Sequence, residues 1–360
     1  MQTKGVTIAA VPATADHDAS APPSRVFQFP RLRYMGSKYK LIPALHDVFT
    51  SIGGNTALDA FSGSGVVSYL LKAEGFGVTS NDFLHFPTSI ARATVVNSAS
   101  TLSDEAVERI CGPAADDRDF IRTKFDGLFL SADDRRFLDT AWSHIDALSG
   151  HERDIAISAL VLSAARKQPR GVFTFTGARY DDGRRDLHLS MSQHFRERVA
   201  DYNRTVFSTG AHSSALTGDV SSLVGAYDLV YLDPPYAPPS DDADYIKRYH
   251  FLEGLSVYWQ GQTIMEETKT KKLTKKFTPF AYKRTIEDAL ATTFEQFRDS
   301  GALVLSYSSN AVPSKDRIVD IMRCTKPNVE VRVLDHRYSF GTHASATRTA
   351  VSEYIFIGRD

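Results

Sequence analysis

The chain has 360 residues, of which 42% are hydrophobic and 24% charged, and its 42 lysines and arginines nearly balance 43 acidic residues. A net charge near zero excludes a globally basic nucleic-acid binder, but it allows a basic groove on an otherwise acidic body. No stretch of about 18 apolar residues could span a bilayer, and the N-terminus lacks a secretory pattern, so a cytoplasmic protein without membrane association is expected. The two cysteines, Cys111 and Cys324, form no metal-binding cluster, so no metal is expected.

The first part of the chain contains a tail and the start of an α/β region. Residues 1–24 are rich in alanine, proline, threonine and serine without apolar periodicity, which predicts a disordered tail. Residues 25–100 include the segment TALDAFSGSGVVSYLLKAEGFGVTSND from Thr56 to Asp82. This pattern predicts a short strand, a Gly/Ser loop, an amphipathic helix and a second strand, which together make one βαβ unit.

The middle of the chain is predicted to be mostly helical, from 101 to 205. In SADDRRFLDTAWSHIDAL, apolar residues recur at helical spacing, and Ser131 and Asp134 stand in the places of a capping box. A more buried helix, DIAISALVLSAARKQPRG, is expected to stop at Pro169. Strand-like pieces then return in five segments: GVFTFTG, YDLVYLD, GALVLSYSS, VEVRVLDH and SEYIFIG. The sequence therefore predicts an α/β fold with a helical insertion before the second α/β part, 206–360.

The glycine loop in LDAFSGSGVVS is the first candidate for a binding site. Gly63 and Gly65 follow the strand that ends at Asp59, and they let the backbone turn tightly and approach a ligand. Asp82, at the end of the next strand, is placed to bind the two hydroxyls of a ribose. The loop lacks the third glycine of the dinucleotide fingerprint, because Ser68 occupies that position. Taken alone, the loop fits S-adenosylmethionine, NAD or a plain glycine turn.

The segment DLVYLDPPYAP, residues 228–238, is the second candidate. Proline fixes its own φ and restricts the residue before it, so Asp233 and Pro234 are rigid at the end of a buried strand. A carboxylate and a free carbonyl, without a thiol, serine or histidine, suit a weak nucleophile that needs orientation. The exocyclic amine of adenine is such a group: Asp233 and the Pro234 carbonyl would accept its N–H bonds, and Tyr236 would stack on a flipped base.

Four motifs in this order, RYMGSKYKL, LDAFSGSG, ND at the second strand and DLVYLDPPY, resemble the Dam-like adenine-specific DNA methyltransferases of the α group. The resemblance implies a Rossmann-like S-adenosylmethionine-dependent fold, with the cofactor part at 25–100, the recognition insert at 101–205 and the DPPY part at 206–360. It implies methyl transfer to N6 of a flipped adenine in double-stranded DNA. Catalysis is expected from Asp233, Pro234 and Tyr236. Lys38 is expected to meet the methionine carboxylate. The full set of implied cofactor residues is Tyr34, Lys38, Asp59, Phe61, Gly63, Gly65, Asp82, Phe83 and Asp219.

DNA contacts are expected from two basic segments. The first is the basic loop 262–285, in which lysines alternate with aromatic residues close to the DPPY motif, although a solvated lysine-rich loop is the plain alternative. The second lies in the insert, where arginines could read guanine edges. The expected contacts are Lys271, Lys272, Lys275 and Lys276 in the loop, and Arg170, Arg179, Arg184 and Arg185 in the insert.

The sequence also allows other functions. The same acid, carbonyl and aromatic set serves an RNA methyltransferase or one that acts on the cytosine amine. A nicotinamide-dependent oxidoreductase would explain the glycine loop but not DPPY, and a non-catalytic nucleic-acid-binding subunit could keep the fold. The resemblance implies a bacterial or phage modification enzyme near the nucleoid, and it leaves open whether a restriction endonuclease accompanies it.

Overall fold

The computed structural model describes residues 7–10, 21–168, 171–174, 183–237, 245–337 and 350–360. Its centre is one eight-stranded sheet with the order β1-β7-β8-β6-β5-β2-β3-β4. All neighbouring strands run parallel except β8, which is antiparallel to both β6 and β7. The strands are β1 (Thr7–Ala10), β2 (Thr56–Asp59), β3 (Gly77–Asp82), β4 (Ser214–Thr217), β5 (Leu229–Leu232), β6 (Ala302–Ser308), β7 (Asn328–Arg337) and β8 (Ala350–Arg359).

Helices cover both faces of the sheet. Leu229 and Tyr231 of β5 belong to one buried cluster, whereas Val230 and Leu232 belong to a second cluster on the opposite face. This alternation explains why β5 is apolar throughout, as in parallel strands that are buried on both sides. The α-helices are α1 (Ile42–Ile52), α2 (Val66–Ala73), α3 (His85–Ala91), α4 (Asp104–Ile110), α5 (Phe120–Lys124), α6 (Ala132–Ile145), α7 (Gly150–Arg166), α8 (Arg185–His188), α9 (Met191–Arg204), α10 (Tyr245–Ser256), α11 (Ile286–Gln296) and α12 (Lys315–Arg323).

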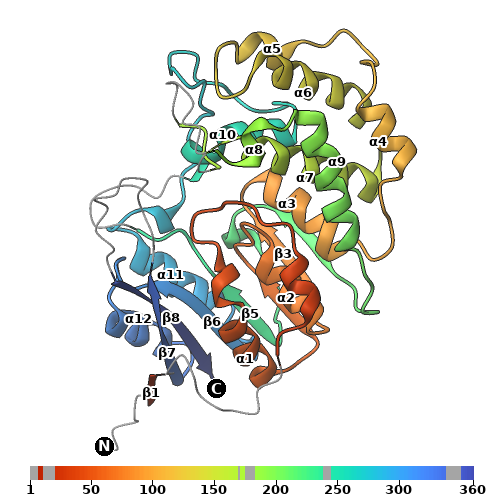
Figure 1. Ribbon diagram of the computed structural model, residues 1–360. Coiled ribbons are helices and arrows are strands. Elements are labelled where there is room, and N and C mark those ends of the chain that lie inside the picture. Colours follow the sequence, from red (N-terminus) through yellow and green to blue (C-terminus); the bar gives the residue numbers. More distant parts are fainter. Residues whose placement is uncertain (1–6, 11–20, 169–170, 175–182, 238–244, 338–349) are drawn as a thin grey trace, which may run out of the picture.

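The two layers of helices differ in size. Helices α11 and α12 pack on the second face, and α1, α2 and α3 pack on the first. Helices α4 to α9 extend the first layer away from the C-terminal strands and gather with α10 in the upper part of Figure 1. The apolar residues of α6, α7 and α9 share one buried cluster with α3 and β5. The predicted helical insert is therefore continuous with the core of the α/β part.

The order in which the chain adds strands to the sheet reverses between β2 and β5. From β2 the chain adds β3 and then β4 on one side, while β5, β6 and the C-terminal strands lie on the other side. The crevice outside the carboxyl ends of strands at such a switch point is where α/β proteins bind ligands. Asp59, Asp82 and Asp233 stand at or directly after the ends of β2, β3 and β5, so all three acids meet at this crevice.

Several predicted elements are confirmed. The βαβ unit consists of β2, α2 and β3, and α6 begins with the predicted capping box, in which Ser131 accepts from the Asp134 amide and Asp134 accepts from the Ser131 amide. Four of the five strand-like segments are β5, β6, β7 and β8. No helix among the described residues is long and apolar enough to cross a membrane.

Two predictions about secondary structure were wrong in part. Within the predicted disordered tail, Thr7–Ala10 forms β1 and pairs in parallel with β7 from Glu330 to Val333. Such pairing satisfies backbone groups at the edge of a sheet, so composition alone does not reveal it. In GVFTFTG, residues 171–174 form no strand, because the Phe173 amide donates to the Arg248 carbonyl (3.1 Å) and its ring stacks on Phe251 instead. The end of that segment lies outside the described residues.

Candidate active site

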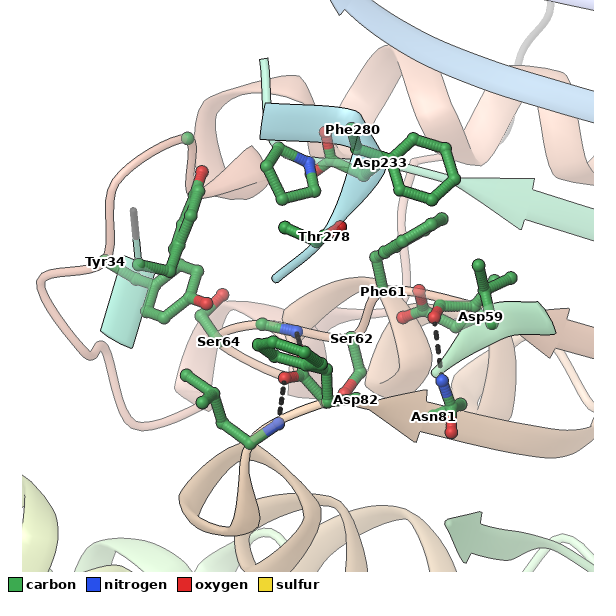
Figure 2. Close-up of a pocket in the computed structure, with 18 of the residues that line it drawn as sticks. Tyr34, Asp59, Phe61, Ser62, Ser64, Asn81, Asp82, Asp233, Thr278 and Phe280 are labelled. Atoms are coloured by element: carbon green, nitrogen blue, oxygen red, sulfur yellow. Dashed lines mark hydrogen bonds between the residues drawn. The ribbon is translucent and has the colours of Figure 1, made fainter. Parts of the chain in front are cut away.

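A pocket opens at the switch point between β2, β3 and β5 and encloses about 1020 Å³ of space, including its open mouth. The strand ends contribute Asp59, Asp82 and Asp233 to its lining. Figure 2 shows Thr278 and Phe280 across the pocket from Asp82. Thr278 and Phe280 come from the predicted basic loop, so this loop forms a wall of the pocket.

The glycine loop is fixed by the acid at the end of β3. The Asp82 carboxylate accepts hydrogen bonds from the amides of Gly63 (2.8 Å) and Leu84 (2.9 Å), both visible in Figure 2. Gly63 and Gly65 have backbone φ values of 49° and 82°, which residues other than glycine rarely adopt. A Cβ on Gly63 would lie 2.9 Å from the Tyr34 ring. The loop therefore needs glycine both for its backbone conformation and for the close approach of Tyr34.

Three buried polar atoms of the pocket have no hydrogen-bond partner among the described residues: Asp59 Oδ1, Ser62 Oγ and Asn81 Oδ1. Asn81 is oriented by its own amide, which donates to the carbonyls of Ala60 and Gly218, both at 3.1 Å. Unpaired buried acceptors are costly, so these atoms indicate a polar ligand that donates hydrogen bonds. The amino and hydroxyl groups of an amino-acid nucleoside would supply such donors.

Asp59 is the most strongly perturbed acid of the pocket. Burial raises the pKa of its carboxyl to about 7, the charges of Asp233 and Asp82 add to the rise, and a 2.6 Å hydrogen bond from Ser68 opposes it. Burial likewise raises the pKa of Asp82 to about 6, against the lowering effect of the Leu84 and Gly63 amides. A site with several crowded acids favours a cation among its ligands.

We expect Asp59→Asn to stabilise the protein at alkaline pH. Because the folded-state pKa of about 7 lies above the unfolded value of about 4, the contribution of this carboxyl to stability is fully present below about pH 4 and is lost as the pH rises through 7. The substitution should raise the free energy of unfolding on the order of 2 kcal/mol at pH 8 and by less at pH 5. Urea denaturation at the two pH values measures the difference.

A matched control for that prediction is Asp228→Asn, directly before the start of β5. The amides of Asn55 and Thr56 donate to the Asp228 carboxylate at 2.7 and 2.9 Å and lower its pKa. Its contribution to stability is present above the unfolded pKa and is lost as the pH falls, so this variant should be less stable than the wild type at pH 8. An equal gain for Asp59→Asn at pH 5 and pH 8 would show that packing, and not ionisation, is responsible.

Aromatic side chains line much of the pocket. The Tyr34 ring stacks on Tyr249 at 4.8 Å between centroids and lies 5.5 Å from Tyr245. Phe61 meets Phe280 edge to face at 5.1 Å. Tyr34, Phe61 and Phe83 were predicted from the sequence, whereas Tyr245, Thr278 and Phe280 were not assigned to the site. The pocket can therefore hold a planar ring between apolar surfaces.

At the end of β5, Asp233 belongs to a buried cluster with Lys38 of η2 (Lys38–Leu41). The Lys38 ammonium lies 2.8 Å from Asp233 Oδ1 and 3.4 Å from Glu353 Oε1. It also donates hydrogen bonds to the Tyr236 hydroxyl and to the Gly36 carbonyl, both at 2.8 Å. Burial raises the pKa of Asp233 to about 6, and the Lys38 charge opposes this rise. The cluster holds the Asp233 carboxylate at the rim of the pocket, with its side chain 17% exposed.

Of the other DPPY residues, Pro235 lines the pocket beside Asp233, whereas Pro234 and Tyr236 are not part of its lining. Pro234 is buried, and the Tyr236 ring packs against Tyr307 at 4.9 Å between centroids. The Tyr236 hydroxyl lies 3.0 Å from Asp233 Oδ1 and 2.6 Å from Glu353 Oε1. The predicted stacking of Tyr236 on a base therefore stays a prediction. Glu353, on β8, is also a member of the cluster and was not predicted from the sequence.

Asp219 both caps a short helix and lines the pocket. Its Oδ1 accepts from the Ser221 amide (2.9 Å) at the start of η4 (Val220–Ser222). The cap uses Oδ1, and the residue still contributes to the pocket lining beside Gly218. The predicted contact of Asp219 with the cofactor stays a prediction.

The residues predicted to contact DNA are distributed over two places. Lys275 and Lys276 line the pocket, with their ammonium groups 5.2 Å from the Tyr282 ring centroid and 5.5 Å from that of Phe83. Lys271 is bonded to Glu266. Lys272 is half-buried, next to Leu273, which forms an isolated β-bridge with Ile264. In the insert, Arg185 is paired with Glu197 and Arg184 precedes α8, while Arg170 and Arg179 lie outside the described residues.

The sheet order and the pocket at its switch point define a Rossmann-like fold of the methyltransferase type. The chain belongs to the D12 class of N6 adenine-specific DNA methyltransferases, because the model of that family matches residues 34–281. This confirms the family resemblance seen in the four sequence motifs. Membership implies S-adenosylmethionine as methyl donor and DNA as substrate.

Two curated relatives are similar to the chain over most of its length. Type II methyltransferase M2.HphI of Haemophilus parahaemolyticus is 26% identical over 357 residues, which cover 92% of this chain and 98% of that protein. Modification methylase LlaI of Lactococcus lactis subsp. lactis is 23% identical over 346 residues, which cover 88% of this chain and 53% of that protein.

Proposed function

We propose that the chain methylates N6 of a flipped adenine at a specific sequence of double-stranded DNA, as the modification enzyme of a bacterial or phage restriction system. The observation that carries this proposal is the position of Asp233, which the cluster with Lys38 holds at the rim of a pocket suited to an amino-acid nucleoside. The names of the two relatives, a type II methyltransferase and a modification methylase, support the restriction context. A cognate restriction endonuclease is the expected companion.

The pocket residues fit S-adenosylmethionine. The unpaired oxygens of Asp59, Ser62 and Asn81 would accept hydrogen bonds from its amino and hydroxyl groups, and the raised pKa of Asp59 fits a carboxyl that receives a cation. Asp82 would bind the ribose while it holds Gly63. When bound, the cofactor supplies a methyl group on a sulfonium: N6 forms the new N–C bond, and the electron pair of the broken C–S bond stays on sulfur.

Other contacts to the cofactor are assigned by their places in the lining. Phe61 and Phe83 would hold the cofactor between apolar surfaces, with Asp219 at the adenine amine. Tyr34 and the backbone of Gly65 would complete the walls. Lys38 lines the pocket from its place in the cluster with Asp233, and its ammonium would meet the methionine carboxylate there.

Asp233 and Pro234 orient the nucleophile. Lys38 and Tyr236 both contact Oδ1 of Asp233, so Oδ2 is the oxygen available to an N6–H donor. With the Pro234 carbonyl as second acceptor, two hydrogen bonds would pull N6 towards tetrahedral geometry and free its lone pair. The proton that N6 loses would pass to Asp233 and then to water through the exposed edge of the side chain.

DNA would reach this pocket beside the basic loop. Lys275 and Lys276 line the pocket, so a phosphate bound by them would lie next to the flipped base. Lys271 and Lys272 would contact the backbone farther along the loop. Base reading is assigned to the insert, with Arg184 and Arg185 among the described residues and Arg170 and Arg179 outside them.

The test is single-molecule sequencing of genomic DNA from a methylation-free bacterial host that expresses the wild type or Asp233→Ala. We expect methyladenine at one sequence motif with the wild type and none with the variant. Unmarked DNA in cells that contain folded, cofactor-binding wild-type protein would contradict the proposal and favour RNA as the substrate.

A further inference from the structure

Glu353 is a buried acid that no motif of the chain explains. It lies on β8, opposite Ser308 of β6 and Leu334 of β7, and its side chain is fully buried. Its Oε2 has no hydrogen-bond partner among the described residues. Residue 353 also lies beyond the residues matched by the family model, which end at 281. An ionisable side chain in the centre of a sheet is costly, so its retention calls for a reason.

The hydrogen bonds of the cluster give Glu353 a defined place. Among the described residues, the Lys38 ammonium has three partners at 2.8 Å, namely Gly36, Asp233 and Tyr236, and it donates to the Tyr236 hydroxyl. The Tyr236 hydroxyl thus accepts from Lys38 and has one proton to donate. The distance to Glu353 (2.6 Å) is shorter than that to Asp233 (3.0 Å), so Glu353 is the better acceptor of this proton.

Two consequences follow for Asp233. Because the phenol proton goes to Glu353, the Asp233 carboxylate shares one fewer donor and remains a stronger acceptor for an incoming amine. The carboxyl groups of Asp233 and Glu353 also both face the ammonium of Lys38, at 2.8 and 3.4 Å. Over the described residues, the cluster therefore holds two acidic side chains and one basic side chain next to the pocket.

We infer that Glu353 is a positioning residue for methyl transfer: it holds Tyr236 and Lys38 in place and gives the cluster beside Asp233 its net negative charge. The inference rests on the proposed function of the pocket. A net negative charge favours a sulfonium donor over the neutral thioether product, and it favours the positive charge that develops on N6 as the methyl group arrives. Glu353 does this without contacting either reactant.

The test compares Glu353→Gln with the wild type by calorimetric binding of two ligands, S-adenosylmethionine and S-adenosylhomocysteine, which differ by a methyl group and one charge. Glutamine keeps the size of the side chain and removes its charge. We expect the preference for the charged ligand to fall on the order of 10-fold, mainly through weaker binding of S-adenosylmethionine. The single-turnover rate of methylation should also fall on the order of 10-fold.

Two further variants separate charge from structure. Glu353→Asp keeps the charge and should retain the wild-type preference between the two ligands. Glu330→Gln, on the neighbouring strand β7 and paired with Arg332, is the matched control and should change neither affinity. Equal weakening of both ligands by Glu353→Gln, or no change in either, would overturn the inference. A wild type that binds both ligands but methylates no DNA would instead refute the proposed function.

Discussion

Replacement of Asp233 by asparagine is expected to lower the rate of methyl transfer by about 10³-fold, with little change in cofactor affinity. The side chain keeps its size and loses the charged acceptor that we propose for N6. Lys38 retains Glu353 as a neighbour at 3.4 Å, so the cluster should not collapse. Transfer of a labelled methyl group to a duplex with the mapped motif, in single-turnover conditions, measures the rate. Calorimetric binding of S-adenosylhomocysteine measures the affinity.

Asp228→Asn provides the control for this experiment, because it makes the same change at the opposite end of β5. Asp228 bonds to the amides of Asn55 and Thr56, away from the pocket, so the variant should transfer the methyl group at the wild-type rate. If Asp233→Asn kept a rate within a few-fold of the wild type, Asp233 could not be the acceptor for N6. A parallel loss of cofactor affinity would place its role in binding.

The residues that can be predicted from the sequence are those with local constraints. Gly63 and Gly65 need positive φ, and Asp233 is fixed by the prolines that follow it, so short patterns identify both places. The strand before each place and the switch-point rule then bring them together. Asp82 could be predicted because it ends the second strand of the same βαβ unit.

Glu353 could not be predicted in this way. It comes 117 residues after Tyr236 in the chain, and only the antiparallel register of β8 against β6 brings it into the cluster. In SEYIFIG it looks like the polar start of a strand, and nothing local indicates that it is buried. Phe280 and Thr278 were not predicted for a related reason. The lysines around them indicated a DNA-binding loop, and nothing local indicated that the loop also lines the pocket.

Lys38→Met should destabilise the protein strongly, and more so as the pH rises. The change removes the ammonium between Asp233 and Glu353 and leaves two carboxylates that share only the Tyr236 hydroxyl. We expect a loss of about 3 kcal/mol in the free energy of unfolding at pH 8, because a buried charge loses its partner. The loss should be smaller at pH 5, where protonation of one carboxyl relieves the repulsion.

The sign of this pH dependence follows from the direction of the pKa shift. In the wild type, burial already raises the pKa of Asp233 to about 6, and Lys38 opposes that rise. Without Lys38 the folded-state pKa moves higher, so the stability that is present below about pH 4 is lost over a wider range as the pH increases. Urea denaturation between pH 5 and pH 8.5 measures it, with Lys40→Met, on the exposed side of the same short helix, as the control. A loss that is equal at every pH would assign the role of Lys38 to packing of its alkyl chain, whereas a loss that grows with pH would show that its charge keeps Asp233 ionised at the pocket.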